Sequence, residues 1–173
     1  LVLVDGRAVY SPSLTGLFWD QQMVPVEDIQ RIELVRGPGA TMWGANAVNG
    51  VINIVTKHAA DTLGGAATAE ASTHNAKRAF ARFGAQIGDI GAIRFYGTAR
   101  HTPSTTDQSG SEYNDGTDGW QAGFRADFEP TASDSVTVQG DYTAIEFEST
   151  TTLGAPGSFL INGTLANKAD GFN

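Results

Sequence analysis

The sequence predicts an α+β segment followed by a run of antiparallel β-strands of the kind that builds a transmembrane β-barrel. Glycine accounts for 21 of the 173 residues and charged residues for only 17%, a composition that suits short strands and turns better than helices. Residues 1–57 hold compact apolar clusters broken by glycine, whereas residues 65–147 alternate apolar and polar side chains. Period-two alternation is typical of strands whose two faces meet different surroundings.

The change in pattern falls between His58 and Leu63, where we place a domain boundary. The first domain is then residues 1–63. The second is residues 64–173, with about five to six strands. Because residues 1–5 begin inside an apolar run and lack the features of a signal peptide, we expect the sequence to be an internal piece of a longer protein.

Within the first domain, the apolar run of residues 1–4 ends at the turn pair Asp5-Gly6. Pro25 followed by two acids predicts a short helical turn over residues 25–29. Small polar residues at 44–49 suggest a second helical turn. The remaining expected strands cover residues 31–36 and 51–56.

The second domain contains five segments whose alternate positions are apolar and whose intervening positions are polar or small. They cover residues 67–74, 79–87, 93–100, 120–129 and 136–144. The connections at residues 87–91 and 130–134 are short, whereas residues 102–118 and the stretch from Ser149 onward are expected to be long polar loops. Short turns at one end and long loops at the other are typical of outer-membrane barrels.

Alternation alone leaves two architectures open. The apolar face could meet lipid around a polar lumen, or it could be the core of a soluble β-sandwich or lipocalin-like barrel.

Composition argues against several other classes of protein. The net charge of −8 and the absence of cysteine argue against a nucleic-acid partner and against thiol chemistry or thiolate metal sites. The sequence contains no run of about 18 apolar residues, so it predicts no membrane-spanning helix.

One long motif distinguishes between these architectures. Residues 26–57 are VEDIQRIELVRGPGATMWGANAVNGVINIVTK. This segment resembles the end of the plug domain of TonB-dependent outer-membrane receptors, in which an Ile-Glu-Val strand precedes Arg-Gly-Pro, a small-residue loop ending in Tyr/Trp-Gly, and Gly-Val-Ile-Asn-Ile-x-Thr-Lys. Residues 2–10 resemble the plug strand just upstream. The resemblance covers residues 1–63 almost continuously, and in that family barrel strands come next.

The resemblance implies roles for particular residues. The arginine of Arg-Gly-Pro, here Arg36, is expected to form a charged lock between plug and barrel wall, with carboxylate partners outside this sequence. A bidentate guanidinium suits such a lock. The alternative is an ordinary surface charge at a strand end. The turns of the motif are assigned to Gly37, Pro38, Gly39, Gly44, Asn49 and Gly50.

The resemblance also implies a function. We expect a bacterial outer-membrane transporter that imports an iron–siderophore-type chelate, energised by the inner-membrane TonB complex, whose contact segment is absent from this sequence. The plug would gate the lumen, outer-membrane lipid would surround the barrel, and neither a cofactor nor catalysis is expected, since no nucleophile–base or paired-carboxylate arrangement is present. The substrate-binding residues stay unassigned. Alternatives are a passive porin-like or adhesin barrel, which lacks the plug motif, and a soluble ligand-binding β-domain, which needs convergent acids in a cleft.

Other residues have simpler explanations. We interpret the acidic cluster of the long loop as a hydrated extracellular loop rather than a calcium site, because its spacing fits no known ligand loop. The three histidines are isolated, so metal ligation is not expected. Trp120, at the start of a strand, suits the aromatic girdle of a barrel. The cluster comprises Asp107, Glu112, Asn114, Asp115 and Asp118, and the histidines are His58, His74 and His101.

Overall fold

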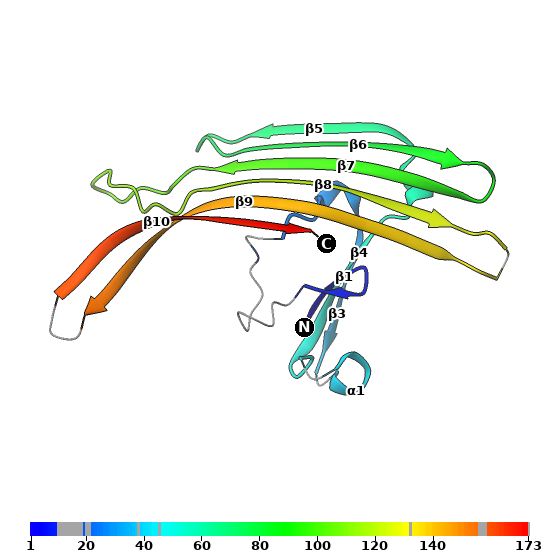
Figure 1. The fold of residues 1–173 in the computed structure, drawn as a ribbon, viewed down its shortest axis with the longest axis horizontal. Coiled ribbons are helices and arrows are strands. Elements are labelled where there is room, and N and C mark those ends of the chain that lie inside the picture. Colours follow the sequence, from blue (N-terminus) through cyan, green and yellow to red (C-terminus); the bar gives the residue numbers. More distant parts are fainter. Residues whose placement is uncertain are drawn as a thin grey trace.

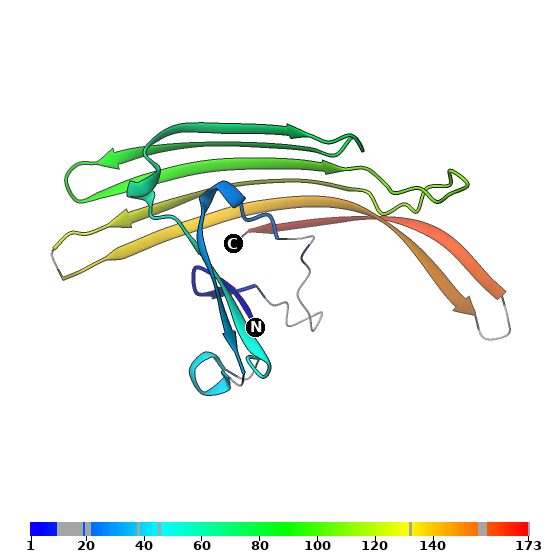
Figure 2. The same cartoon turned by 180° about the vertical axis from the view of Figure 1, so that it is seen from behind.

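The protein consists of two β-sheets joined by a short linker (Figure 1). The computed structural model describes residues 1–9, 19, 22–37, 39–44, 46–131, 133–155 and 159–172. A four-stranded sheet has the order β2-β1-β4-β3, and a six-stranded sheet has the order β10-β9-β8-β7-β6-β5. The long strands of the larger sheet arch over the smaller sheet, which lies on one side of it in both views (Figures 1 and 2).

The smaller sheet contains the expected apolar runs. It comprises β1 (Val2–Val4), β2 (Arg7–Ala8), β3 (Ile29–Arg36) and β4 (Gly50–Thr56). Strand β1 pairs in parallel with β4 and antiparallel with β2, while β3 runs antiparallel to β4. Leu3, Ala47 and Val51 form a small buried cluster, against which Leu1 packs. The strands predicted in this part of the sequence are confirmed.

The helical elements are short. The 3-10 turn η2 (Val26–Asp28) follows Pro25 as predicted. The prediction of a helical turn at residues 44–49 is wrong, because α1 (Ala40–Trp43) lies earlier and Gly44, at φ 87°, ends it. A backbone conformation with positive φ suits glycine and stops a right-handed helix. A second 3-10 turn, η3 (Ala59–Thr62), forms the linker between the sheets.

The larger sheet is a meander in which each strand pairs antiparallel with the next. Its first five strands lie where alternation predicted them, with shifted ends. The long polar loop predicted from Ser149 onward is wrong, because β9 continues to Ala155 and a sixth strand follows. This segment lacks clear alternation, so its sequence concealed the strand. The strands are β5 (Gly64–Ala71), β6 (Lys77–Ile87), β7 (Gly91–Thr102), β8 (Thr117–Phe128), β9 (Val136–Ala155) and β10 (Phe159–Phe172).

The two faces of the larger sheet differ. Phe83, Phe95 and Phe124 are cross-strand neighbours on one face, and Phe83 and Phe95 remain 61% and 53% exposed. No second layer of the described residues covers this apolar face, whereas a soluble sandwich would bury it. The opposite face carries arginines and faces the smaller sheet. Within the described ranges, no helix is long and apolar enough to span a membrane.

Candidate functional site: the interface between the two sheets

The smaller sheet reaches the larger one through the Asp5 turn, η2 and the end of β4. Asp5 and Gly6 form the two-residue turn between β1 and β2, both with positive φ, as Asp-Gly hairpin turns do. The Asp5 carboxylate accepts hydrogen bonds from the Thr56 backbone N–H and from Thr56 Oγ1, each 2.8 Å long. These bonds tie the turn to the end of β4.

Turn η2 presents the neighbouring acids Glu27 and Asp28 to the larger sheet. The Lys57 N–H donates to the Asp28 carbonyl oxygen (2.8 Å), and Lys57 Nζ donates to the Glu27 carbonyl oxygen (2.7 Å). The backbone of η2 is thereby held beside the end of β4. The residue Asp28 is only 1% exposed, so its carboxylate requires compensating partners.

Four arginines on the polar face of the larger sheet pair with Asp28 and the neighbouring acids. Arg78 and Arg82 come from β6, Arg94 from β7 and Arg125 from β8. Arg94 and Arg125 are directly opposite each other in the β7–β8 register. Like charges at such positions repel, so this face depends on nearby carboxylates.

Asp28 lies between two of these guanidinium groups. Arg82 Nη1 donates to Asp28 Oδ1, and Arg94 Nε lies 3.5 Å from Asp28 Oδ2. Arg94 is as deeply buried as Asp28, and its Nη1 also donates to the Lys57 carbonyl oxygen (3.0 Å). The arginine therefore contacts both a side chain and the backbone of the smaller sheet.

Glu27 and Arg78 form a bidentate pair beside this contact. Arg78 Nη1 and Nη2 donate to the two Glu27 oxygens at 3.0 and 2.6 Å, and Arg78 also bonds Glu70 of β5. Hydrogen bonding from Arg78 is the largest cause that lowers the pKa of Glu27 below its ordinary value of 4.5, while burial opposes it. The pair is thus a charge-assisted contact between an ionised Glu27 and the wall.

A third contact joins Asp5, Arg125 and the linker. Arg125 Nη1 lies 3.3 Å from Asp5 Oδ2, and Arg125 Nε donates to Asp127 Oδ2 (2.8 Å). Asp127 also accepts from the Ala59 N–H (2.7 Å) in η3. The same arginine therefore organises both the smaller sheet and the linker.

The buried and partly buried charges of the interface balance. Three guanidinium groups, of Arg82, Arg94 and Arg125, face three carboxylates, of Asp5, Asp28 and Asp127. Removing one member leaves an uncompensated charge in a poorly solvated site, which is costly. We call these six residues together with Glu27 and Arg78 the acid–arginine seat.

The residues singled out from the motif lie elsewhere. Arg36 is exposed at the far end of β3, opposite Gly50 of β4, and makes no ion pair with any described residue. Ile29, at the start of β3, lies beside the seat. A strand rises about 3.4 Å per residue, so Arg36 at the other end of β3 lies about 24 Å away from Ile29. Figure 1 shows β3 leading away from the larger sheet toward α1.

The turn residues of the motif lie around the end of β3 that carries Arg36. Gly50 has φ 145°, and a Cβ there would lie 2.6 Å from the Val35 carbonyl oxygen, so only glycine fits. Gly37 has φ 96°. Gly39 accepts two α1 backbone N–H groups at its carbonyl. Gly44 ends α1 and Asn49 is exposed before β4. Pro38 lies outside the described residues.

The seat itself was not identified from the sequence. Asp28 and Arg82 are 54 positions apart, and no local pattern reveals such a pair. A usable signal was present, however. Arginines occupy the polar face of three successive predicted strands, and two adjacent acids follow Pro25.

The acids of the long loop have local partners, and two histidines lie beside carboxylates of the larger sheet. Asp107 accepts hydrogen bonds from Ser109 and Ser111, and Asp115 accepts two from Thr105. Ser109 is the largest cause that lowers the pKa of Asp107. These carboxylates thus organise the loop's own backbone. His101 bonds Asp118 (2.6 Å), and His58 Nε2 lies 3.7 Å from Asp127.

A small sheet seated by ion pairs on the polar face of a larger sheet, whose other face is apolar and exposed, defines a plugged barrel wall of the outer-membrane type. Residues 1–51 match the family model of the TonB-dependent Receptor Plug Domain. The ferric enterobactin receptor PirA of Pseudomonas aeruginosa is 36% identical over 118 residues, covering 60% of this chain, and the ferrienterobactin receptor of Escherichia coli is 34% identical over 116 residues, covering 59%. The chain spans 16% of the length of each of these relatives.

Solved structures show the same fold. The copper transporter OprC matches 99% of this chain and 26% of its own with a TM-score of 0.66 at 14% identity. The siderophore receptor PirA of Acinetobacter baumannii matches 84% of this chain and 23% of its own with a TM-score of 0.59 at 23% identity. The plug match and these relatives support the chain as a fragment of a TonB-dependent receptor of the bacterial outer membrane.

Proposed function

We propose that this chain forms the plug–barrel junction of a TonB-energised transporter that imports a ferric siderophore. The observation that carries the proposal is the acid–arginine seat, in which plug carboxylates bind arginines of the barrel wall. A passive pore does not need a domain held in its lumen by breakable charge-assisted bonds. The names of the related ferric enterobactin receptors support the substrate class.

In this proposal the plug comprises residues 1–63 and the barrel begins at residue 64. Two contacts of linker η3 support this boundary. The Ala59 N–H bonds Asp127 of the wall, and a Cβ at Gly84 of β6 would collide with the Thr62 carbonyl oxygen at 2.2 Å. The linker and the wall are thus in direct backbone contact. An energising pull on the plug would have to detach the seat without moving this boundary.

Arg36 is proposed as the second attachment point. It lies at the opposite end of β3 from the seat, so its carboxylate partners would come from wall strands that follow residue 173. The plug would then be held by its acids at one end and by a guanidinium at the other.

The test is uptake by the full-length receptor in a bacterial strain without its own ferric siderophore receptors. We expect radiolabelled ferric enterobactin to accumulate when the inner-membrane TonB complex is intact and to stop accumulating when TonB is deleted. A porin-like barrel would continue to admit the chelate without TonB, and an adhesin would import none in either strain. Either result would overturn the proposal.

A further inference from the structure

A hollow of about 310 Å³ lies where the linker meets one end of the larger sheet. The linker contributes Ala60, the turn between β6 and β7 contributes Ile90, and Glu129 directly follows β8. The Glu129 N–H donates to the Ile90 carbonyl oxygen (2.7 Å), so the turn and the end of β8 are joined beside the hollow. Figures 1 and 2 show the linker, this turn and the end of β8 at the same end of the sheet. The hollow therefore lies at the proposed plug–barrel boundary.

Part of the lining is apolar and exposed. Leu63 and Ile90 are each 50% exposed, and Ala60 and Ala92 also line the hollow. Leu63 and Ile90 lie in connections rather than in strands, so the lipid-facing strand positions do not account for their exposure. Exposed apolar side chains around a concave site indicate contact with a partner.

Two carboxylates on the same lining have no cationic partner. Asp89 and Glu129 are exposed, and among the described residues neither side chain forms a hydrogen bond or an ion pair. His58, which also lines the hollow, lies 3.7 Å from Asp127 instead, and Asp127 is already paired with Arg125. The hollow thus carries negative charge that the surrounding side chains do not compensate.

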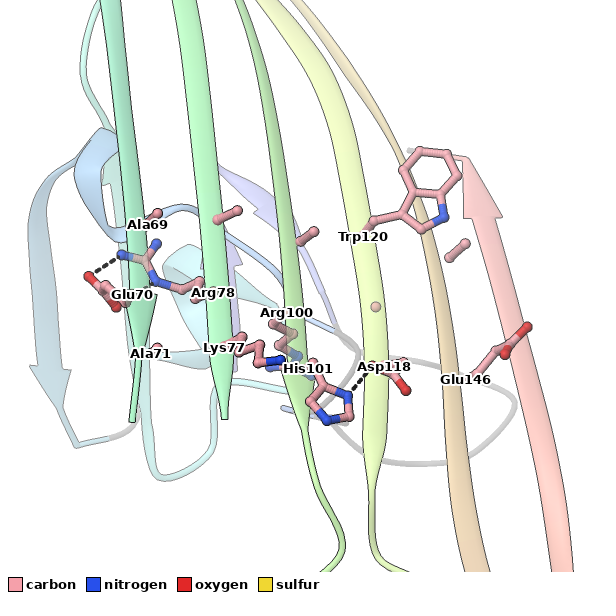
Figure 3. A pocket seen from close by; sticks show the side chains of 14 residues that line it. Ala69, Glu70, Ala71, Lys77, Arg78, Arg100, His101, Asp118, Trp120 and Glu146 are labelled. Carbon is pink, nitrogen blue, oxygen red and sulfur yellow. Dashed lines mark hydrogen bonds and ion pairs between the residues drawn. The ribbon is translucent and has the colours of Figure 1, made fainter. Parts of the chain in front are cut away.

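A larger hollow at the opposite end of the sheet differs in this respect (Figure 3). Of its acids, Glu70 bonds Arg78 (2.8 Å) and Asp118 bonds His101 (2.6 Å), as the dashed lines show. Those two carboxylates have cationic partners within the chain. The carboxylates beside the linker are available to a cation from outside it.

We propose that the hollow beside the linker binds a lysine or arginine side chain of a periplasmic polypeptide. The methylene stem covers Leu63 and Ile90, and the cation lies between Asp89 and Glu129. Basic side chains combine an apolar stem with a charged end, which matches the two parts of this lining. Because Ala60 of the linker also lines the hollow, the bound polypeptide contacts the plug–barrel boundary directly. The proposal rests on the proposed function, which places this end of the sheet in the periplasm.

The test uses full-length receptor purified in a neutral detergent and peptides of the sequence Gly-Ser-X-Ser-Gly that carry an uncharged fluorophore. Position X is lysine, norleucine, which keeps the apolar stem without the charge, or diaminopropionate, which keeps the charge on a shorter stem. We expect fluorescence anisotropy to show that the wild-type receptor binds the lysine peptide about tenfold more tightly than either analogue, equivalent to about 1.4 kcal/mol. The norleucine peptide tests the acids, and the diaminopropionate peptide tests the apolar lining.

Substitutions in the hollow should reduce these preferences separately. Asp89→Asn and Glu129→Gln should each weaken the preference for lysine over norleucine, because one carboxylate fewer faces the cation. Ile90→Ser should weaken the preference for lysine over diaminopropionate, because the stem loses an apolar contact. The matched control Asp134→Asn removes one carboxylate from the β8–β9 turn, where it accepts a hydrogen bond from Thr131, and should bind all the peptides like wild type.

Equal affinity of the wild-type receptor for the lysine and norleucine peptides would overturn the proposal. So would an equal loss of preference in Asp134→Asn, which would indicate attraction by the general negative charge of this end of the sheet. Competition by free lysinamide as strong as that by the unlabelled lysine peptide would also overturn it, because the site would then take a small molecule. Peptide binding is measured without uptake and without TonB, so its failure is distinguishable from failure of the transport function.

Discussion

Asp28 holds a carboxylate that is almost inaccessible to solvent between the guanidinium groups of Arg82 and Arg94. Asp28→Asn keeps the shape of the side chain but leaves the arginines with one uncompensated charge. Breaking a buried pair in this way costs about 3–5 kcal/mol. In the full-length receptor we expect the plug to become sensitive to protease while the barrel keeps its resistance to heat in detergent.

The matched control is Asp61→Asn, which removes an exposed carboxylate in the linker. It should leave the protease sensitivity unchanged. If Asp28→Asn and Asp61→Asn behave alike, the seat does not hold the plug.

Arg36 tests the other end of the plug. If it locks the plug to later wall strands, Arg36→Ala should increase leakage of large antibiotics or alter energised uptake at matched receptor abundance. Arg36→Lys should restore function only in part, because an ammonium group lacks the bidentate geometry of a guanidinium. Equal antibiotic sensitivity and uptake in all three proteins would make Arg36 a surface charge at a strand end.

Because Glu27 pairs with Arg78, we expect the attachment of the plug to depend on pH. Because the pKa of Glu27 is lowered by Arg78 in the folded protein, its stabilising contribution is complete above its ordinary pKa of 4.5 and is lost as the pH falls through the lower folded value. We expect the protease sensitivity of the plug to rise as the pH falls below about 5. The rise should be smaller in Glu27→Gln, which has no carboxylate to protonate at this position. A pH profile identical in wild type and Glu27→Gln would contradict this assignment.

At the scale of elements, the antiparallel pairing determines which loops lie at the same end of the larger sheet. If the plug enters the barrel from the periplasm, β5 runs outward, the loop between β7 and β8 is extracellular, and the β8–β9 turn is periplasmic. A cysteine introduced at Ser109 in the full-length protein should react with an impermeant maleimide on intact cells, whereas one at Ser133 should not. The reverse labelling pattern would invert the barrel.

Alternation predicted elements well where side chains separate into two environments. Strand β7 was predicted because Ile93 and Phe95 alternate with Arg94 and Tyr96, and lipid and lumen impose that separation. Strand β10 was missed because residues 159–172 mix apolar, small and charged positions without a regular period. The helical turn was misplaced because small residues occur on both sides of Gly44, and the positive φ of Gly44 ends α1 there.

The pairing within the seat was missed for a different reason. Residues 26–57 revealed the family through a local motif, but the contact between Asp28 and Arg82 depends on how two sheets meet. Sequence reasoning assigned Arg36 from the motif. It did not assign Arg78, Arg82, Arg94 and Arg125, whose partners emerge only in the folded structure.

At the scale of the whole molecule, the larger sheet is open within the described residues, with β5 and β10 as its edges. Family barrels of this type have about 22 strands, so six strands leave two unpaired edges and an exposed apolar face. Expressed alone, residues 1–173 should aggregate or require detergent, as size-exclusion chromatography would show. A monomeric species with a cooperative thermal transition in plain buffer would contradict this expectation.

The acid–arginine seat also limits how freely plugs and barrels can be recombined. A chimera that keeps β6–β8 of this wall but receives a plug without carboxylates at positions 5, 27 and 28 would present Arg82, Arg94 and Arg125 to a neutral partner. Of the three carboxylates that now face these guanidinium groups, Asp127, on the wall itself, would remain. The exchangeable unit in this protein is therefore larger than the plug: it includes the first four barrel strands, and a graft made at the linker would divide one electrostatic assembly in two.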